Sequence, residues 1–158
     1  MTDLQLRPSS FPWPPLIYLA AIALAIVAHF VYPLPWFSSP LSDILFAAGG
    51  LVILAVVLID VAAFKAFRRH KTTMRPDRAA DHLITDGPFS FTRNPIYLGN
   101  TMLTFGVGLI SGIAWFLPLA LIAAFATQKL AIEREERHLY ARFGKRFRDY
   151  TKRVRRWI

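Results

Sequence analysis

The sequence of 158 residues contains no cysteine. This absence excludes disulfide bonds, a thiolate nucleophile and any metal site built on cysteine. Histidine is also scarce, because the chain has only His29, His70, His82 and His138. Their positions do not follow the HxxxH or HExxH spacing that places two metal ligands on one helix face. We therefore expect no metal site.

Acidic residues are few, with 10 Asp and Glu against 19 Lys and Arg, which gives a net charge of +9. Such an excess can indicate nucleic-acid binding, but no nucleic-acid motif is present, so no such partner is expected. The chain is 54% hydrophobic, which is too apolar for an ordinary soluble domain. The first apolar run is longer than the core of a secretory signal and follows Pro12, Pro14 and Pro15. We expect it to remain as a membrane anchor.

Apolar residues occur in three blocks. Residues 16–37 and 41–64 are each long enough to cross a bilayer, which takes about 20 helical residues. Residues 96–132 are too many for one span but suit two, with a break around Gly108, Ser111 and Gly112. The sequence therefore predicts an all-α integral membrane protein with four transmembrane helices in two hairpins.

The basic residues predict the orientation of these spans, because Lys and Arg accumulate in cytoplasmic loops. All but Arg7 lie in residues 65–93 or from Lys129 onward, whereas the turns at 38–40 and 110–112 carry no charge. Both termini and the central loop should therefore be cytoplasmic. The predicted order is a tail (1–15), a first hairpin (16–64), a cytoplasmic basic loop (65–95), a second hairpin (96–132) and a basic amphipathic C-terminal helix (133–158). Apolar residues at helical spacing predict that this helix lies on anionic lipid: Phe143, Phe147, Tyr150, Val154 and Trp157.

The segment GPFSFTRNPIYLG, from Gly87 to Gly99, lies between the basic loop and an apolar run. Pro95 suits the first position of a helix, with Asn94 as its N-cap. The free N–H groups of that helix start, together with Arg93, would attract a carboxylate or a phosphate. Alternatively, Arg93 extends to lipid headgroups and Asn94-Pro95 only starts a helix.

A second motif, EExxLxxxFG, begins at Glu135 and Glu136 and ends at Gly144. Helical spacing places both carboxylates on the apolar face with Ile132 and Leu139. Carboxylates facing the interior at membrane depth need partners or a ligand. They could neutralise Arg93 or Lys129, but we favour a ligand, because intramembrane acids are usually functional.

S-adenosyl-L-methionine matches these groups. Its carboxylate suits Arg93 and the helix start, and its ribose hydroxyls suit a glutamate. Its adenine ring and sulfonium suit aromatic faces such as those of Phe89, Phe91 and Tyr97. The two motifs therefore predict a cofactor site at the membrane surface.

The second half of the chain, from about Asp81 to Val154, resembles the isoprenylcysteine carboxyl methyltransferase family of integral membrane methyltransferases. More loosely, it resembles the phospholipid N-methyltransferases. The resemblance is carried by GPF, RNPIYLG and EExxLxxxFG, followed by Tyr150 and Val154. It implies S-adenosyl-L-methionine as cofactor, held by Asp81, His82, Leu83, Ile84, Phe89, Asn94, Pro95, Ile96, Tyr97 and Glu135.

Several positions depart from the family pattern. Asn94 replaces the usual histidine, and Phe89 and Phe147 stand where tyrosines are common. Ala131 stands where eukaryotic members place the arginine that holds the prenylcysteine carboxylate. We therefore discount a prenylcysteine substrate and expect a lipid amine, a lipid acid or another lipophilic acceptor.

Two residues are candidates for the reaction itself. Arg93 would orient the cofactor or an acidic substrate, and Glu136 would take the proton of an amine acceptor. The alternative is a non-catalytic membrane protein that retains the methyltransferase fold. Retention of Tyr97, Glu135 and Glu136 argues against that alternative, because an unused pocket has no need of buried acids.

Overall fold

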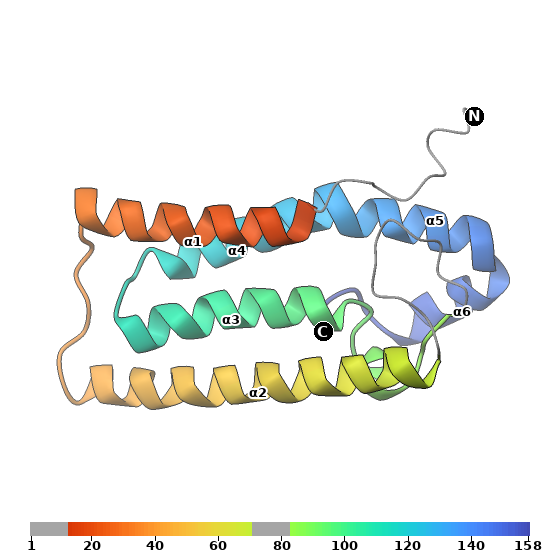
Figure 1. Ribbon diagram of the computed structural model, residues 1–158, viewed down its shortest axis with the longest axis horizontal. Coiled ribbons are helices and arrows are strands. Elements are labelled where there is room, and N and C mark those ends of the chain that lie inside the picture. Colours follow the sequence, from red (N-terminus) through yellow and green to blue (C-terminus); the bar gives the residue numbers. More distant parts are fainter. Residues whose placement is uncertain (1–12, 71–82) are drawn as a thin grey trace.

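The computed structural model describes residues 13–70 and 83–158 (Figure 1). All regular secondary structure in these two ranges is helical, as predicted. The elements are α1 (Trp13–Val31), α2 (Leu41–Arg69), the short 3-10 helix η2 (Gly87–Ser90), α3 (Pro95–Ser111), α4 (Phe116–Thr127), the π-helical turn η3 (Gln128–Ile132), α5 (Glu133–Phe143) and α6 (Lys145–Arg153).

Within residues 13–70 and 83–158, three helices are long and apolar enough to cross a membrane. They are α1, α2 and the continuous helix Phe116–Phe143, which comprises α4, η3 and α5. The remaining apolar helix, α3, has 17 residues. It is about 26 Å long at about 1.5 Å per residue, against a hydrocarbon core of about 30 Å. The predicted break after it is confirmed, because α3 ends at Ser111 and Gly112 adopts the left-handed conformation with φ +70°.

The apolar helices pack in the order α2, α3, α4, α1 (Figure 1). Between α1 and α4 the core consists of Tyr18, Ala21, Ala25, Phe116, Leu119 and Ala123. Because α1 packs on α4 and α2 packs on α3, the two helices of the predicted first hairpin are covered by different partners.

The contact between α2 and α3 depends on glycine. A Cβ atom added to Gly49 would lie 2.9 Å from the carbonyl oxygen of Gly106, and one added to Gly106 would lie 3.3 Å from that of Gly49. Small residues at such crossings let two membrane helices approach closely. The two helices run antiparallel, and a Cβ atom added to Gly99, near the start of α3, would lie 2.9 Å from Oδ1 of Asp60. The start of α3, where the first motif lies, is thus packed against the second half of α2.

The predicted single helix over residues 133–158 is instead two helices and an extended segment. The break falls at Gly144, whose φ of +49° favours glycine, and α6 ends before the extended residue Val154. The side chains of Phe147, Tyr150 and Val154 are buried together, in contact with Leu83 and Leu139. The apolar side of this segment therefore faces the protein, where the sequence predicted contact with lipid.

Candidate functional site

The two sequence motifs meet in the structure through Tyr97 and Glu135. The hydroxyl of Tyr97, in the first turn of α3, donates a hydrogen bond of 2.6 Å to Oε1 of Glu135, in the first turn of α5. Pro95 starts α3 and Asn94 is its N-cap residue, as predicted. Residues 38 positions apart in the chain are therefore joined at the site expected from the two motifs.

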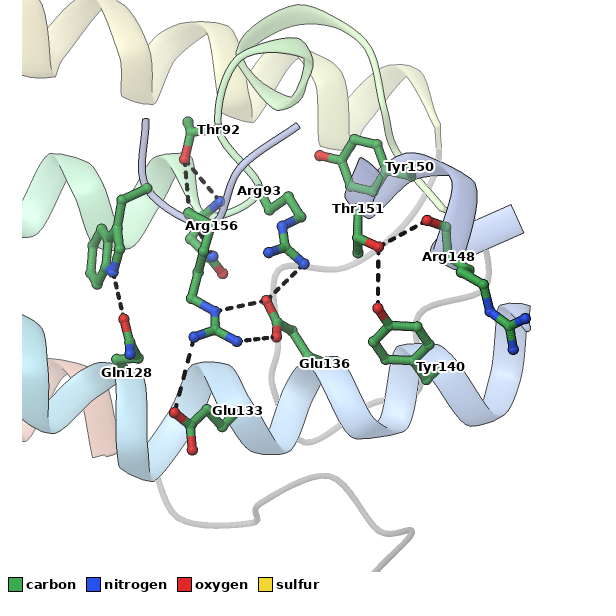
Figure 2. Close-up of polar contacts among 12 residues, drawn as sticks. Thr92, Arg93, Gln128, Glu133, Glu136, Tyr140, Arg148, Tyr150, Thr151 and Arg156 are labelled. Carbon is green, nitrogen blue, oxygen red and sulfur yellow. Dashed lines mark hydrogen bonds and ion pairs between the residues drawn. The ribbon is translucent and has the colours of Figure 1, made fainter. Parts of the chain in front are cut away.

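Arg93 forms an ion pair with the other glutamate of the motif (Figure 2). Its Nη1 lies 3.0 Å from Oε1 of Glu136, and the two side chains are only 14% and 13% exposed. Arg93 thus neutralises Glu136 and does not extend to lipid headgroups. Its Nε is buried and has no hydrogen-bond partner among the described residues. A buried donor without a partner is costly, so a ligand that accepted from this N–H would be stabilised there.

A second guanidinium, which sequence reasoning missed, also binds Glu136 (Figure 2). Arg156 donates from Nε to Oε1 at 3.0 Å and from Nη2 to Oε2 at 2.6 Å. Its Nη1 lies 4.0 Å from Oε1 of Glu133, which also pairs with Lys129 at 2.7 Å. Hydrogen bonding to Glu136 raises the pKa of Arg156. The result is a paired, cation-rich cluster in which one carboxylate holds two arginines.

The side chain of Asn94 does not cap α3, although the residue stands at the N-cap position. Its Nδ2 donates to the carbonyl oxygen of Arg156 at 2.9 Å. Its backbone N–H donates to Oγ1 of Thr92 at 3.2 Å. Asn94 therefore supplies the donor expected at this position but directs it to the C-terminal segment of the chain.

The aromatic residue after the Gly-Pro turn is held by two contacts. The ring of Phe89 packs edge-on against Phe67 of α2, with centroids 5.5 Å apart. The carbonyl oxygen of Phe89 accepts a hydrogen bond of 2.6 Å from the hydroxyl of Tyr150. Burial raises the pKa of Tyr150, so this hydroxyl remains a donor.

The other predicted cofactor residues fall into three groups. Ile84 and Pro95 are buried, and Ile96 is half-buried. Leu83 packs against the cluster of Phe147, Tyr150 and Val154. Asp81 and His82 lie outside the described residues.

The profile of the phospholipid methyltransferase family matches residues 44–146. The chain belongs to this family. The family is one of membrane methyltransferases and is related to the isoprenylcysteine carboxyl methyltransferases, which confirms the resemblance seen in the sequence. The matched range contains Arg93, Tyr97, Glu135 and Glu136 but ends before Arg156.

A curated relative of this family member is the nickel-cobalt-cadmium resistance protein NccN of Alcaligenes xylosoxydans xylosoxydans. The two are 35% identical over 77 residues, which are 49% of this chain and 36% of that protein. The match therefore spans about a third of the relative's length. No solved structure matches this chain significantly.

The groups assembled in this phospholipid methyltransferase family member suit S-adenosyl-L-methionine. The orphaned Nε of Arg93 lies next to the start of α3, so both can attract a carboxylate. Glu135 is held by Tyr97 and can accept hydrogen bonds from ribose hydroxyls. The residues present therefore fit the two polar ends of this cofactor.

Proposed function

We propose that the chain is an S-adenosylmethionine-dependent membrane methyltransferase that acts on a lipophilic or amphiphilic acceptor. Membership of a membrane methyltransferase family supports the reaction type. The observation that carries the proposal is the hydrogen bond from Tyr97 to Glu135, because it joins the two motifs expected to hold one cofactor.

Each polar residue of the site has a proposed role. Glu135 accepts hydrogen bonds from the ribose, and Arg93 and the start of α3 hold the methionyl carboxylate. The remaining contacts come from Asp81, His82, Leu83, Ile84, Phe89, Asn94, Pro95, Ile96 and Tyr97. The bound cofactor would supply a methyl group on a sulfonium centre. Holding the acceptor in line with that group would lower the activation barrier, because the entropic cost of bringing the two groups together is met on binding.

The acceptor could carry a carboxylate or an amine. A carboxylate needs no base, whereas an amine must lose a proton, for which we propose Glu136. Two arginines bind the oxygens of Glu136, so proton uptake there competes with two cations that favour the charged carboxylate. Transfer to an amine should fall as the pH is lowered, and transfer to a carboxylate should fall much less.

We further propose that the protein spans the membrane four times, with its site at the cytoplasmic face. The end of α2, the start of α3 and the helices α5 and α6 lie at one end of the molecule (Figure 1). Of the basic residues of the central loop, Lys65, Arg68 and Arg69 lie near the end of α2 and Arg93 lies just before α3, and most basic residues of the C-terminal part lie on α5 and α6. If this end of the molecule is cytoplasmic, the placement of Lys and Arg agrees with their accumulation in cytoplasmic loops.

Methyl transfer from labelled S-adenosylmethionine to extracted lipid tests the proposal. Membranes containing the wild type should label a lipid fraction, and Glu135→Gln should abolish the labelling. Asp149→Asn is the control, because Asp149 is an exposed carboxylate on α6 whose only described ion pair is with Lys152 at 3.9 Å. Equal labelling in membranes with and without the protein would refute the proposed activity.

A non-catalytic membrane protein with this fold is the second candidate. It is favoured by the double pairing of Glu136, which leaves that carboxylate satisfied within the protein. This candidate predicts well-folded protein that binds no S-adenosylmethionine.

A further inference from the structure

The chain continues beyond α6 as a short segment that we name the C-terminal clasp, residues 154–157. Its first residue, Val154, is extended and buried in the cluster with Phe147 and Tyr150. The following residues pass between the start of α3 and the helix that carries the two glutamates (Figure 2). The clasp therefore lies between the two motifs of the proposed site.

On one side, the clasp binds the residues that lead into α3 through its backbone. The N–H of Arg93 donates to the carbonyl oxygen of Arg155 at 3.0 Å. The carbonyl oxygen of Arg156 accepts from Nδ2 of Asn94 at 2.9 Å and from Oγ1 of Thr92 at 3.3 Å. Three consecutive residues of the first motif are thus tied to the clasp.

On the other side, the clasp binds η3 and α5 through its side chains. Arg156 donates two hydrogen bonds to Glu136, at 3.0 and 2.6 Å. Nε1 of Trp157 donates to Oε1 of Gln128 at 2.8 Å. A bidentate guanidinium–carboxylate pair fixes orientation as well as distance.

We propose that Arg156 is a positioning residue that closes this clasp and so holds Arg93 and Asn94 against Glu136. This inference rests on the proposed function, because it assigns the clasp to the proposed cofactor site. Residues 154–157 lie beyond the range 44–146 that matches the family. The clasp is thus a feature of this chain outside the matched part.

The geometry explains why Arg156 would act through its neighbours. Nη1 of Arg93 shares Oε1 of Glu136 with Arg156, so the plane of that carboxylate sets where the Arg93 guanidinium lies. The orphaned Nε of Arg93 is directed accordingly. Without the Arg156 side chain, Glu136 keeps one guanidinium, and the backbone carbonyl that binds Asn94 is no longer anchored to α5.

The test compares three variants with the wild type in S-adenosylmethionine binding by purified full-length protein. Arg156→Ala should weaken binding by about tenfold or more, because charge-assisted hydrogen bonds are among the strongest polar contacts. Arg156→Lys keeps the charge but not the fork, so its affinity should lie between those of Arg156→Ala and the wild type. Arg153→Ala removes an exposed arginine at the end of α6 and should stay within about twofold of the wild type.

The fraction of protein molecules that bind the cofactor distinguishes a positioning role of Arg156 from a role in stability alone. A positioning role changes the dissociation constant while the fraction of protein that binds stays near the wild-type value. A lower binding fraction with an unchanged dissociation constant would overturn the proposal, as would wild-type affinity in Arg156→Ala. Wild-type affinity in Arg156→Lys would show that a positive charge is enough and that the bidentate geometry is not needed. That result would also overturn the proposal.

Amide hydrogen exchange without ligand distinguishes failure of the clasp from failure of the proposed function. The Arg93 amide, which donates to Arg155, should exchange slowly in the wild type and Arg153→Ala and faster in Arg156→Ala. Equal exchange rates in the wild type and both variants would overturn the proposed role of Arg156 in the clasp. If the exchange rates differ as expected but the wild type does not bind S-adenosylmethionine, the proposed function fails and the clasp stands as a structural element only.

Discussion

At the scale of single residues, the site depends on hydrogen bonds to buried carboxylates. Tyr97 donates to Glu135 at 2.6 Å, and both side chains are partly buried. A buried polar group that loses its partner keeps the cost of leaving water without the compensating bond. The Tyr97 hydroxyl therefore matters both for stability and for the orientation of Glu135.

Tyr97→Phe tests this bond. Removing the hydroxyl should lower the free energy of unfolding by about 1–3 kcal/mol, because Glu135 loses a donor. Chemical unfolding in detergent measures the change. The control is Tyr140→Phe, which removes an exposed hydroxyl that contacts Thr151 at 3.1 Å and should have a much smaller effect. Equal losses in the two variants would contradict the special role of the Tyr97–Glu135 bond.

The sequence predicted some of these residues and missed others for a physical reason. Pro95 and Asn94 have local preferences for a helix start, and the spacing of Glu135 and Glu136 indicates an interior face. Arg156 has no such signal, since it is one of several basic residues near the end of the chain. Its role depends on tertiary contact with Glu136, which spacing along the chain does not reveal.

At the scale of elements, the contact between α2 and α3 places the first motif. Gly49 lies where a Cβ atom would come within 2.9 Å of both the Gly106 carbonyl oxygen and Cβ of Leu109. The next residue, Gly50, has open space at the same position. Alanine substitutions at these two neighbouring glycines therefore distinguish the effect of helix packing from that of helix propensity.

Gly49→Ala and Gly50→Ala should change stability in opposite directions. Gly49→Ala should lower the free energy of unfolding by about 1–3 kcal/mol through overpacking. Gly50→Ala should raise it by up to about 1 kcal/mol, because alanine favours the helix. Thermal unfolding of both variants in the same detergent measures this. Stabilisation by both changes would show that α2 and α3 do not approach closely at Gly49.

Local sequence signals predict some breaks between elements better than others. Gly108, Ser111 and Gly112 interrupt an apolar run, so the turn between α3 and α4 was predictable. Residues 133–158 keep a helical spacing of apolar residues across Gly144, which favoured one helix. The break there follows from burial of Phe147 and Tyr150 against Leu139, which is a tertiary contact.

At the scale of the whole molecule, the proposed four-span topology determines which side the site faces. The absence of cysteine makes labelling of single introduced cysteines unambiguous. Ser39 and Ser111 are exposed and lie in or beside the two uncharged turns, whereas Lys152 is exposed on α6. These positions report opposite sides of the membrane under the proposal.

Intact cells treated with a membrane-impermeant maleimide should label Ser39→Cys and Ser111→Cys. Lys152→Cys should react only after the membrane is opened, because the basic C-terminal part is placed in the cytoplasm. Reaction of Ser39→Cys and Lys152→Cys from the same side would contradict the topology. Failure of Ser111→Cys alone to react would contradict a membrane-spanning α3.

Titration of S-adenosylmethionine into purified protein in lipid nanodiscs tests whether the two motifs form one cofactor site. The wild type should bind saturably with one site per chain. Glu135→Gln should lose most of the affinity while keeping wild-type thermal stability within a few degrees, because the amide can still accept from Tyr97. Folded wild-type protein that shows no saturable binding would contradict a cofactor site formed by the two motifs.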